Sequence, residues 1–269
     1  MKNLFFALGL LFVLVLSSQF TAAQNRAKLF EIKKVPAAKS IKSSIASVRE
    51  SEISIDFSNF RQTETLEIPL FDGKTYFAGK TETEVRAMDE FSWRGKIPQG
   101  NFSGAGIITL RKGYVSGLIY APNAVYEIVL QGEKQVLVEL DQSLFPECGG
   151  ELKGAETKTI QTENIGAGTD SGDRIDVLVI YTTAVKNSLG GDIQAQAFAQ
   201  QAIDSTNTAY INSKIRQRVR LIAAQETTLA EVGSLQTELS NVRNDATVAN
   251  LRNQVNADLV AMLSNTSDA

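Results

Sequence analysis

The residue with the most distinctive chemistry is Cys148, the only cysteine of the chain, which lies in the tetrapeptide Pro146-Glu147-Cys148-Gly149. A thiolate is a nucleophile and a strong ligand for zinc. A free cysteine can also serve simply as a small apolar residue at the end of a strand. A single cysteine excludes an internal disulfide and a zinc module built from several cysteines. Cys148 is therefore a candidate reactive thiol, with strand packing as the alternative.

Histidine is absent from all 269 residues. Because histidine is the usual general base and the commonest zinc ligand, these residues can build neither a Ser-His-Asp triad nor a histidine-bound zinc centre by themselves. The sequence also lacks a phosphate-binding glycine loop between a strand and a helix, a dinucleotide-binding fingerprint and a Gly-x-Ser-x-Gly turn. These residues therefore contain none of the motifs of the commonest hydrolases and nucleotide-binding proteins.

Three aspartates, Asp170, Asp173 and Asp176, lie close together in the sequence. Their spacing marks no acid–base pair, and acids beside a glycine-rich stretch are ordinarily solvated. The overall charge is equally uninformative about catalysis: 27 basic and 30 acidic residues give a net charge of −3. Because phosphate backbones attract a basic face, we expect no nucleic-acid partner.

The amino terminus has the pattern of a signal peptide, which we assign to residues 1–23. A short positive start at 1–3 precedes an apolar run over 4–16, and small residues at 21–23 offer a cleavage site before Gln24. The apolar run is shorter than the ~20 residues that span a bilayer. The sequence therefore predicts a secreted or extracytoplasmic protein, with no membrane contact after signal removal.

Residues 24–148 form the first structural block, and strands dominate its prediction. Alternating apolar residues that run into glycine-containing turns indicate hairpins. The expected hairpins lie at 66–85, 107–120 and 126–140. Phe91 and Trp93, two positions apart, are expected to share one face of a strand and to pack in the core. Short strands with tight turns are typical of an antiparallel sandwich or barrel.

Residues 149–173 interrupt this pattern with six glycines, many polar residues and no aromatic residue. Such a composition buries little apolar surface and predicts an exposed, flexible linker. Exposed linkers are preferred sites of proteolysis, and Lys153 and Lys158 offer basic cleavage points within this one.

Residues 174–269 follow a third pattern, in which strands and helices alternate. The near-continuous apolar run at 175–181 is typical of a central strand covered on both faces. A helix is expected over 192–212, where apolar residues recur every three or four positions. The elements expected after it are a strand at 219–224, short helices at 235–242 and 248–255, and a strand at 259–263. This order predicts an α/β layer.

Four segments of this last region resemble the bacterial reprolysin-like zinc metalloproteases, a metzincin family. They are 175–182 (IDVLVIYT), 206–213 (TNTAYINS), 218–221 (RVRL) and 257–260 (ADLV). Their order and spacing fit the first half of that family's catalytic domain. The β-rich region at 53–140 resembles, more loosely, the propeptide that precedes such domains.

The resemblance implies a multidomain fold, in which a β-rich antiparallel propeptide domain precedes an incomplete α/β metzincin-like catalytic domain. The implied boundaries are a signal peptide at 1–23, a propeptide domain at 24–148, a linker at 149–173, and the amino-terminal part of the protease domain at 174–269. The family's His-Glu-x-x-His-x-x-Gly-x-x-His motif is absent from this chain. We therefore expect zinc only in a full-length parent, and an inactive chain here.

The resemblance also implies a reaction, partners and site residues. The family hydrolyses peptide bonds with a metal-activated water, so protein or peptide substrates are expected. An activating protease is expected to cut within the linker. Cys148 resembles an inhibitory cysteine switch, whose thiolate occupies the open position of zinc. Asp176 and Asp258 occupy the places of acids that bind a structural calcium in this family, although surface carboxylates are the commoner outcome.

Other classes of protein remain open. An exported binding or adhesion module could join a β-rich unit to an α/β layer, as in a von Willebrand A-like domain. That domain needs an Asp-x-Ser-x-Ser motif after its first strand, which residues 181–184 (YTTA) do not supply. A truncated homologue that acts as a decoy or inhibitor is a third interpretation.

Overall fold

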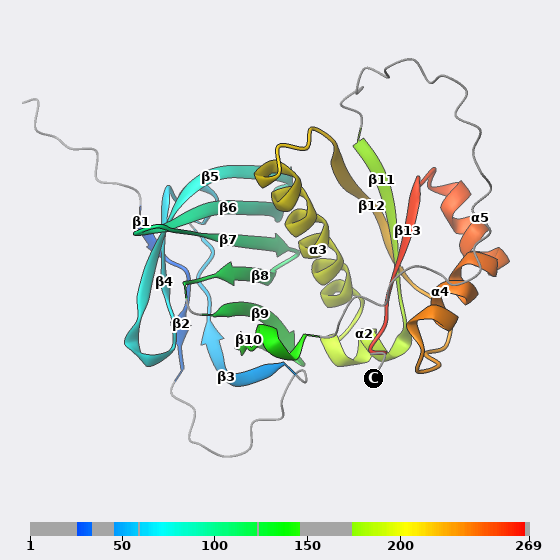
Figure 1. Cartoon of the computed structure of the whole chain (residues 1–269), viewed down its shortest axis with the longest axis horizontal. Coiled ribbons are helices and arrows are strands. Elements are labelled where there is room, and N and C mark those ends of the chain that lie inside the picture. The colour runs from blue at the N-terminus through cyan, green and yellow to red at the C-terminus, as the bar shows by residue number, and fades with distance from the viewer. Residues whose placement is uncertain (1–25, 34–45, 59, 123, 146–173, 267–269) are drawn as a thin grey trace, which may run out of the picture.

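The computed structural model describes residues 26–33, 46–58, 60–122, 124–145 and 174–266 (Figure 1). The predicted signal peptide, Cys148 and the predicted linker therefore lie outside the described residues. Within the described ranges, the chain is rich in strands, which are mostly antiparallel, and has a few helices, as the sequence predicts. No helix in these ranges is both long and apolar enough to cross a membrane.

A ten-stranded sheet contains all the described strands that precede residue 146. Its order is β1-β4-β5-β6-β7-β8-β9-β10-β3-β2. The strands are β1 (Arg26–Lys28), β2 (Glu31–Ile32), β3 (Ser47–Ser54), β4 (Thr65–Pro69), β5 (Thr75–Ala87), β6 (Glu90–Gln99), β7 (Phe102–Arg111), β8 (Tyr114–Tyr120), β9 (Val125–Gln131) and β10 (Lys134–Leu140). All pairs are antiparallel except β1 with β4, which is parallel. The three predicted hairpins are confirmed as β4–β5, β7–β8 and β9–β10.

The sheet nearly closes on itself. Its two edge strands, β1 and β2, are separated in the chain only by Leu29 and Phe30. Because the three Cα–Cα steps from Lys28 to Glu31 reach only about 10 Å, the opposite edges of the sheet must lie close together. Both linking residues are fully buried in the core that the sheet encloses, which also contains Trp93, Ile108 and other apolar side chains. The prediction that Phe91 and Trp93 pack in the core is confirmed.

The alternation of β6 gives the sheet a second, polar face. Phe91 and Trp93 point into the enclosed core, whereas Ser92 and Arg94 point to the opposite side. An antiparallel sheet ordinarily exposes such a face to water. Here it is buried: Ser92 is 0% and Arg94 is 4% exposed. Another element must therefore cover this part of the sheet.

The second sheet is parallel and has the order β12-β11-β13. Its strands are β11 (Arg174–Tyr181), β12 (Arg218–Glu226) and β13 (Leu259–Leu263), and its helices are α2 (Thr183–Leu189), α3 (Asp192–Asn212), α4 (Leu235–Asn244) and α5 (Ala246–Gln254). The predicted strands and the long helix are confirmed, with β11 central as expected. The sequence reading missed α2, which begins at a Thr182 N-cap whose hydroxyl accepts from the Val185 amide.

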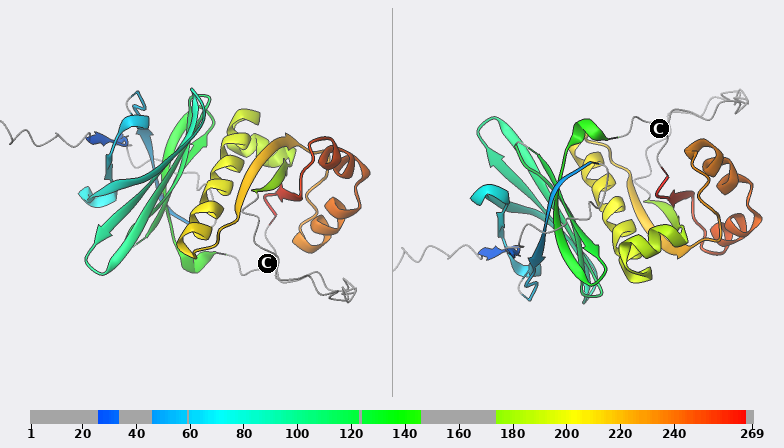
Figure 2. Two further views of the ribbon diagram at one scale, coloured as in Figure 1. Left: turned by 90° about the horizontal axis from the view of Figure 1, so that it is seen from above. Right: turned by 90° about the horizontal axis from the view of Figure 1, so that it is seen from below.

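Helix α3 lies between the two sheets (Figures 1 and 2). One side packs through Ala199 and Ile203 against Val177, Val179 and Val219 of the parallel sheet. The other side contacts β7 and β8 of the ten-stranded sheet. Helices α4 and α5 cover the remaining face of the parallel sheet, where Val248 packs with the side chains of β11. The polar face of the ten-stranded sheet is thus covered by α3.

Candidate functional site

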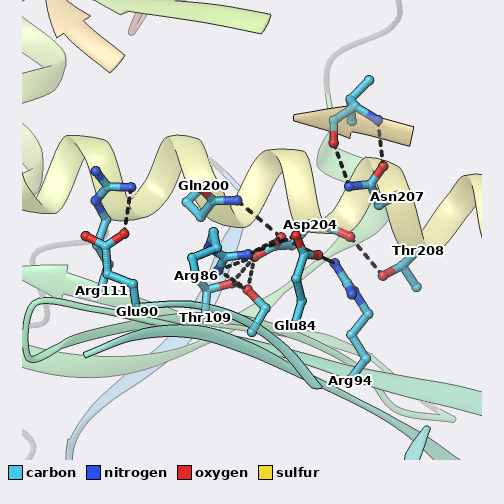
Figure 3. Close-up of polar contacts among 12 residues, drawn as sticks. Glu84, Arg86, Glu90, Arg94, Thr109, Arg111, Gln200, Asp204, Asn207 and Thr208 are labelled. Carbon is cyan, nitrogen blue, oxygen red and sulfur yellow. Dashed lines mark hydrogen bonds and ion pairs between the residues drawn. The ribbon is translucent and has the colours of Figure 1, made fainter. Parts of the chain in front are cut away.

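Asp204, in the middle of α3, is the most deeply buried acid among the described residues, with 0% exposure. It lies where α3 crosses the polar face of the ten-stranded sheet (Figure 3). A buried carboxylate is stable only when it is paired and hydrogen-bonded. We call Asp204, together with Arg86, Ser92, Arg94 and Thr109, the Asp204 site.

Three uncharged hydrogen-bond donors contact the carboxylate of Asp204. Thr109 Oγ1 of β7 donates to Asp204 Oδ2 at 2.7 Å, and Ser92 Oγ of β6 donates to the same oxygen. Gln200, one turn earlier on α3, donates through Nε2 to Oδ1 at 3.3 Å. Three uncharged donors from two sheet strands and the helix therefore satisfy the lone pairs of this carboxylate.

Two guanidinium groups supply the opposite charge. Arg94 Nη2 lies 3.3 Å and Arg86 Nη1 lies 3.4 Å from Asp204 Oδ1. Arg94 also pairs with Glu82 at 3.1 Å and with Glu84 at 3.2 Å, so its charge is shared among three acids. Because charge-assisted hydrogen bonds in a dry interior are strong, these contacts hold α3 at one position on the sheet.

The Asp204 site is closed to substrates. Asp204, Ser92 and Thr109 are each 0% exposed. A nucleophile or a general base must reach its substrate, and these fully buried side chains cannot do so. The arrangement suits a structural anchor between the sheet and the helix, not a catalytic group.

On its other side, α3 is fixed to the parallel sheet by Asn207. Its side-chain Nδ2 donates to Val219 O at 2.9 Å, and its Oδ1 accepts from Val219 N at 2.8 Å. This two-way contact pairs the amide with the backbone of β12 as a strand residue would. Asn207 therefore fixes the position of α3 relative to β12.

The structure brings the two predicted calcium candidates together. Asp258 N donates to Asp176 O, and Asp258 Oδ2 accepts from Asp176 N, both at 2.8 Å. The Asp176 carboxylate accepts two hydrogen bonds from Arg220, at 2.7 and 2.6 Å. These hydrogen bonds from Arg220 hold the pKa of Asp176 below its ordinary value. A carboxylate neutralised by arginine is a poor cation ligand, so calcium has no support here.

Two further glutamates lie where β11 and β13 end. Glu231 accepts from the Thr182 hydroxyl at 2.5 Å and from the Asn265 amide at 3.0 Å. Glu238, 1% exposed, accepts from Thr266 Oγ1 at 2.5 Å. Burial alone would raise the pKa of Glu238, but hydrogen bonds from Thr266, Ser264 and nearby backbone amides outweigh it and lower the pKa. These acids fix the chain as it leaves β13.

Glu127 on β9 is the acid with the largest upward pKa shift among the described residues. Its cross-strand neighbours are Leu118 of β8 and Val138 of β10, both apolar. Burial among such neighbours raises the pKa of Glu127 to about 7. Burial also raises the pKa of Tyr120, and the negative charge of Glu127 makes a smaller contribution in the same direction.

A zinc centre does not fit the residues at hand. Zinc sites need three or four ligands from histidine, cysteine or acids. The chain has no histidine, and no group of three or more candidate ligands occurs in the described ranges. We therefore derive no catalytic step through a metal from these residues.

The sequence singled out Asp176, Asp258 and Cys148 as candidate site residues but not those of the Asp204 site; Cys148 lies outside the described residues. The partners of Asp204 lie 95 to 118 positions away in the chain. A single acid on an amphipathic helix normally faces water, so local sequence gives no sign of this burial. One signal was available: Asp204 is preceded by Gln200 and Gln201, which together form a polar patch on the inner side of a predicted helix.

Comparison with known proteins points to a metallopeptidase family. No family model matches the chain. Three curated relatives, all named peptidyl-Asp metalloendopeptidase, are each 26% identical to it. The first, from Stenotrophomonas maltophilia K279a, aligns with 94% of this chain and 68% of its own length. Distant relatives with this name support a relation to a metallopeptidase family.

The other two relatives align over smaller shares. That of Stenotrophomonas maltophilia R551-3 covers 73% of this chain and 48% of its own length. That of Xanthomonas campestris pv. campestris covers 86% and 61%. The chain thus spans between about half and two-thirds of the length of these relatives. Among solved structures, a chain in "Structure of a chaperone-substrate complex" aligns at 15% identity with a TM-score of 0.33, a similarity too weak to indicate a shared fold.

Proposed function

We propose that this chain is the amino-terminal portion of an exported zinc metalloendopeptidase precursor of the reprolysin-like type. The observation that carries the proposal is the alignment of 94% of the chain with a peptidyl-Asp metalloendopeptidase. The same alignment covers 68% of that relative, so a part of the relative has no counterpart in these residues. Zinc ligands belong, on this proposal, to that remaining part.

Within the proposal, the ten-stranded sheet is the propeptide and residues 174–269 begin the catalytic domain. Residues 149–173 form the segment that an activating protease cuts, and residues 1–23 direct export. The fold supports this division because a mostly antiparallel sheet and a parallel sheet with helices occupy successive parts of the chain. Two different sheet types in sequence order are typical of separate folding units.

The proposed substrates are proteins and peptides, cleaved at aspartyl residues as the names of the relatives indicate. Bound zinc would supply a metal-activated water for this hydrolysis. The described residues contribute the scaffold: Glu231 and Glu238 hold the chain at 265–266, where it leaves the parallel sheet. Cys148 is proposed as the thiolate that silences the precursor.

The coding sequence beyond the Ala269 codon tests this proposal. We expect an open reading frame that continues into a His-Glu-x-x-His-x-x-Gly-x-x-His motif. The extended protein should cleave a peptide that contains one aspartate, should lose that activity with a zinc chelator, and should spare the same peptide with asparagine in place of aspartate. A stop codon directly after Ala269 would refute the proposal and leave an exported binding protein as the better interpretation.

The proposed role of Cys148 has a separate test in the extended precursor. Cys148→Ser should raise the activity of the uncut precursor, because serine binds zinc far more weakly than a thiolate does. Cys148→Ser with an unchanged, silent precursor would remove Cys148 from the inhibitory mechanism while leaving the peptidase assignment intact.

A further inference from the structure

We propose that the polar face of the ten-stranded sheet is a docking surface for α3, and that it holds the α3-containing unit after the chain between them is cut. The partner is the helix of this same chain, recognised by the buried carboxylate of Asp204. The association itself follows from the described contacts. Its meaning for activation, that a cut alone does not release the sheet, rests on the proposed function.

The chemistry of the interface differs on the two sides of α3. Toward the parallel sheet, Ala199 and Ile203 pack in an apolar cluster with β11 and β12. Toward the ten-stranded sheet, Asp204 meets hydroxyl and guanidinium groups, and Gln200 of the same helix donates to its carboxylate. Residues 199 and 203 share one side of the helix, and residues 200 and 204 share the next, as a period of 3.6 requires. Helix α3 therefore packs on the parallel sheet through its apolar side and contacts the ten-stranded sheet through its polar side.

The sheet side of the interface can tolerate separation. Ser92, Arg94, Thr109 and Ser116 are polar residues on the covered face, and all are buried. Obligate interfaces resemble apolar cores, whereas separable ones remain polar. The hydroxyl and guanidinium groups of this face would accept water once α3 was removed, and the apolar Ile107, which also faces α3, would become exposed. The ten-stranded sheet also keeps its own apolar core, which α3 does not complete.

Specificity comes from the carboxylate. Asp204 accepts from two sheet hydroxyls and faces two arginines, so a helix without an acid at this position leaves Arg86 and Arg94 with less compensation. Removing one partner of a buried ion pair is costly because the other charge stays desolvated. Ser116 Oγ of β8 donates to Ala197 O of α3 at 3.2 Å, and this contact further fixes the position of the helix along the sheet. The docking surface thus selects a helix with one acid placed opposite β6 and β7.

A cleavable form of the whole chain tests the proposal. A short recognition site for a sequence-specific protease is placed between residues 149 and 173, and the purified protein is cut and passed over a sizing column at micromolar concentration. We expect the two fragments to elute together. Separate elution of the wild-type fragments would overturn the proposal.

Two matched substitutions then test the role of Asp204 in the cut protein. Asp204→Asn keeps the shape of the side chain and removes its charge, and we expect affinity to fall about 100-fold or more. Asp192→Asn is the control, because Asp192 lies on the same helix but is exposed and accepts from Tyr181 of the parallel sheet. Equal dissociation constants for the two variants would remove Asp204 from recognition.

If Asp204→Asn does not fold, a change on the sheet side decides the question. Thr109→Val removes one donor to Asp204 without changing shape, and should weaken association about 10-fold. Thr83→Val is its control, because the buried Thr83 hydroxyl has no hydrogen-bond partner among the described residues. No difference between these two variants would overturn the assignment. Since no step measures hydrolysis, fragments that separate would contradict this inference and leave the proposed function standing.

Discussion

Thr109 on β7 donates a 2.7 Å hydrogen bond to Asp204 on α3, across 95 positions of the chain. Both residues have 0% exposure. This bond joins the antiparallel sheet to the helix that packs on the parallel sheet, so a contact between two buried polar groups links the two halves of the described chain. Its neighbours, two arginines and a serine, make it one part of a charged network and not an isolated bond.

Thr109→Val should lower the stability of the uncut chain. The substitution leaves a buried carboxylate with one donor fewer, and a hydrogen bond to a charged group contributes about 1.5–3 kcal/mol. We expect a loss of about that size in the free energy of unfolding, measured by chemical denaturation. Thr83→Val removes a buried hydroxyl without a described partner and should be close to neutral. An equal loss in both variants would show that the bond to Asp204 contributes nothing specific.

Asn207→Ala should loosen the attachment of α3 to the parallel sheet. The substitution deletes both hydrogen bonds to the backbone of Val219 and leaves a buried amide and carbonyl unpaired. Unsatisfied buried groups cost about 1–3 kcal/mol each. Faster hydrogen exchange at β12 amides is the expected result, with exchange in β7 and β8 unchanged. Thr206→Ala, which alters the adjacent, partly exposed residue, serves as the control.

Gly95→Ala should be among the most disruptive small substitutions in the ten-stranded sheet. A Cβ at position 95 would lie 2.5 Å from Trp93 Cζ3 and 2.9 Å from Gly79 O. The indole cannot move away freely, because Trp93 is fully buried and its Nε1 donates to Thr63 O at 3.0 Å. Overpacking of this kind costs about 1–3 kcal/mol.

Gly79→Ala supplies the matched control for that prediction. Gly79 lies on the neighbouring strand β5, and a Cβ there would meet nothing within 4 Å. We expect its thermal midpoint to stay near that of the wild type. A Gly95→Ala variant as stable as Gly79→Ala would mean that Trp93 repacks and that the core around it is more adaptable than the contacts indicate.

Much of the fold could be predicted from local sequence. The hairpins at β7–β8 and β9–β10 were predictable because apolar alternation runs into turns with glycines of positive φ, Gly113 at 83° and Gly132 at 62°. The central position of β11 was predictable because its apolar run continues on both faces. In each case the residues that determine the element lie within a few positions of one another.

The candidate site could be predicted only in part, because its partners are distant in the chain. Alternation places Ser92 and Arg94 on the face opposite Trp93, but nothing local shows that α3 covers this face. The adjacency of Asp176 and Asp258 was expected only through the family resemblance, and their contact with Arg220 was not foreseen. Which polar residues are buried depends on how the two sheets pack, and that packing has no short-range pattern.

The contact between Asp176 and Arg220 predicts an acid-dependent loss of stability. Arg220 lowers the pKa of Asp176 below 3.8, so the ion pair stabilises the fold above that value and the contribution is lost as pH falls through the lower, folded-state pKa. Asp176→Asn should therefore be slightly less stable than the wild type at neutral pH and equal to it in strong acid. The difference is small because the Arg220 side chain is half exposed.

The same variant decides the calcium question. Adding calcium to the wild type should leave its thermal midpoint unchanged, because Arg220 already neutralises the Asp176 carboxylate. A rise in the midpoint with calcium that both Asp176→Asn and Asp258→Asn abolish would contradict this expectation and restore the calcium site that the family resemblance implies.

The raised pKa of Glu127 predicts that the protein loses stability as the pH rises. Its pKa is raised from 4.5 to about 7 by burial between Leu118 and Val138, so the folded protein holds this proton more tightly than the unfolded chain does. The resulting stabilisation is fully present below pH 4.5 and is lost as pH rises through about 7. Glu127→Gln is uncharged throughout, and its thermal midpoint should exceed that of the wild type at about pH 8 and approach it at about pH 5.

Glu133→Gln is the control for this pH dependence, because Glu133 lies exposed in the turn between β9 and β10. Thermal unfolding of the three proteins across the pH range gives the measurement. The gap between Glu127→Gln and the wild type should widen with rising pH, while Glu133→Gln should follow the wild type. A constant gap would show that the effect of the substitution is packing alone, and that the pKa of Glu127 does not differ between the folded and the unfolded protein.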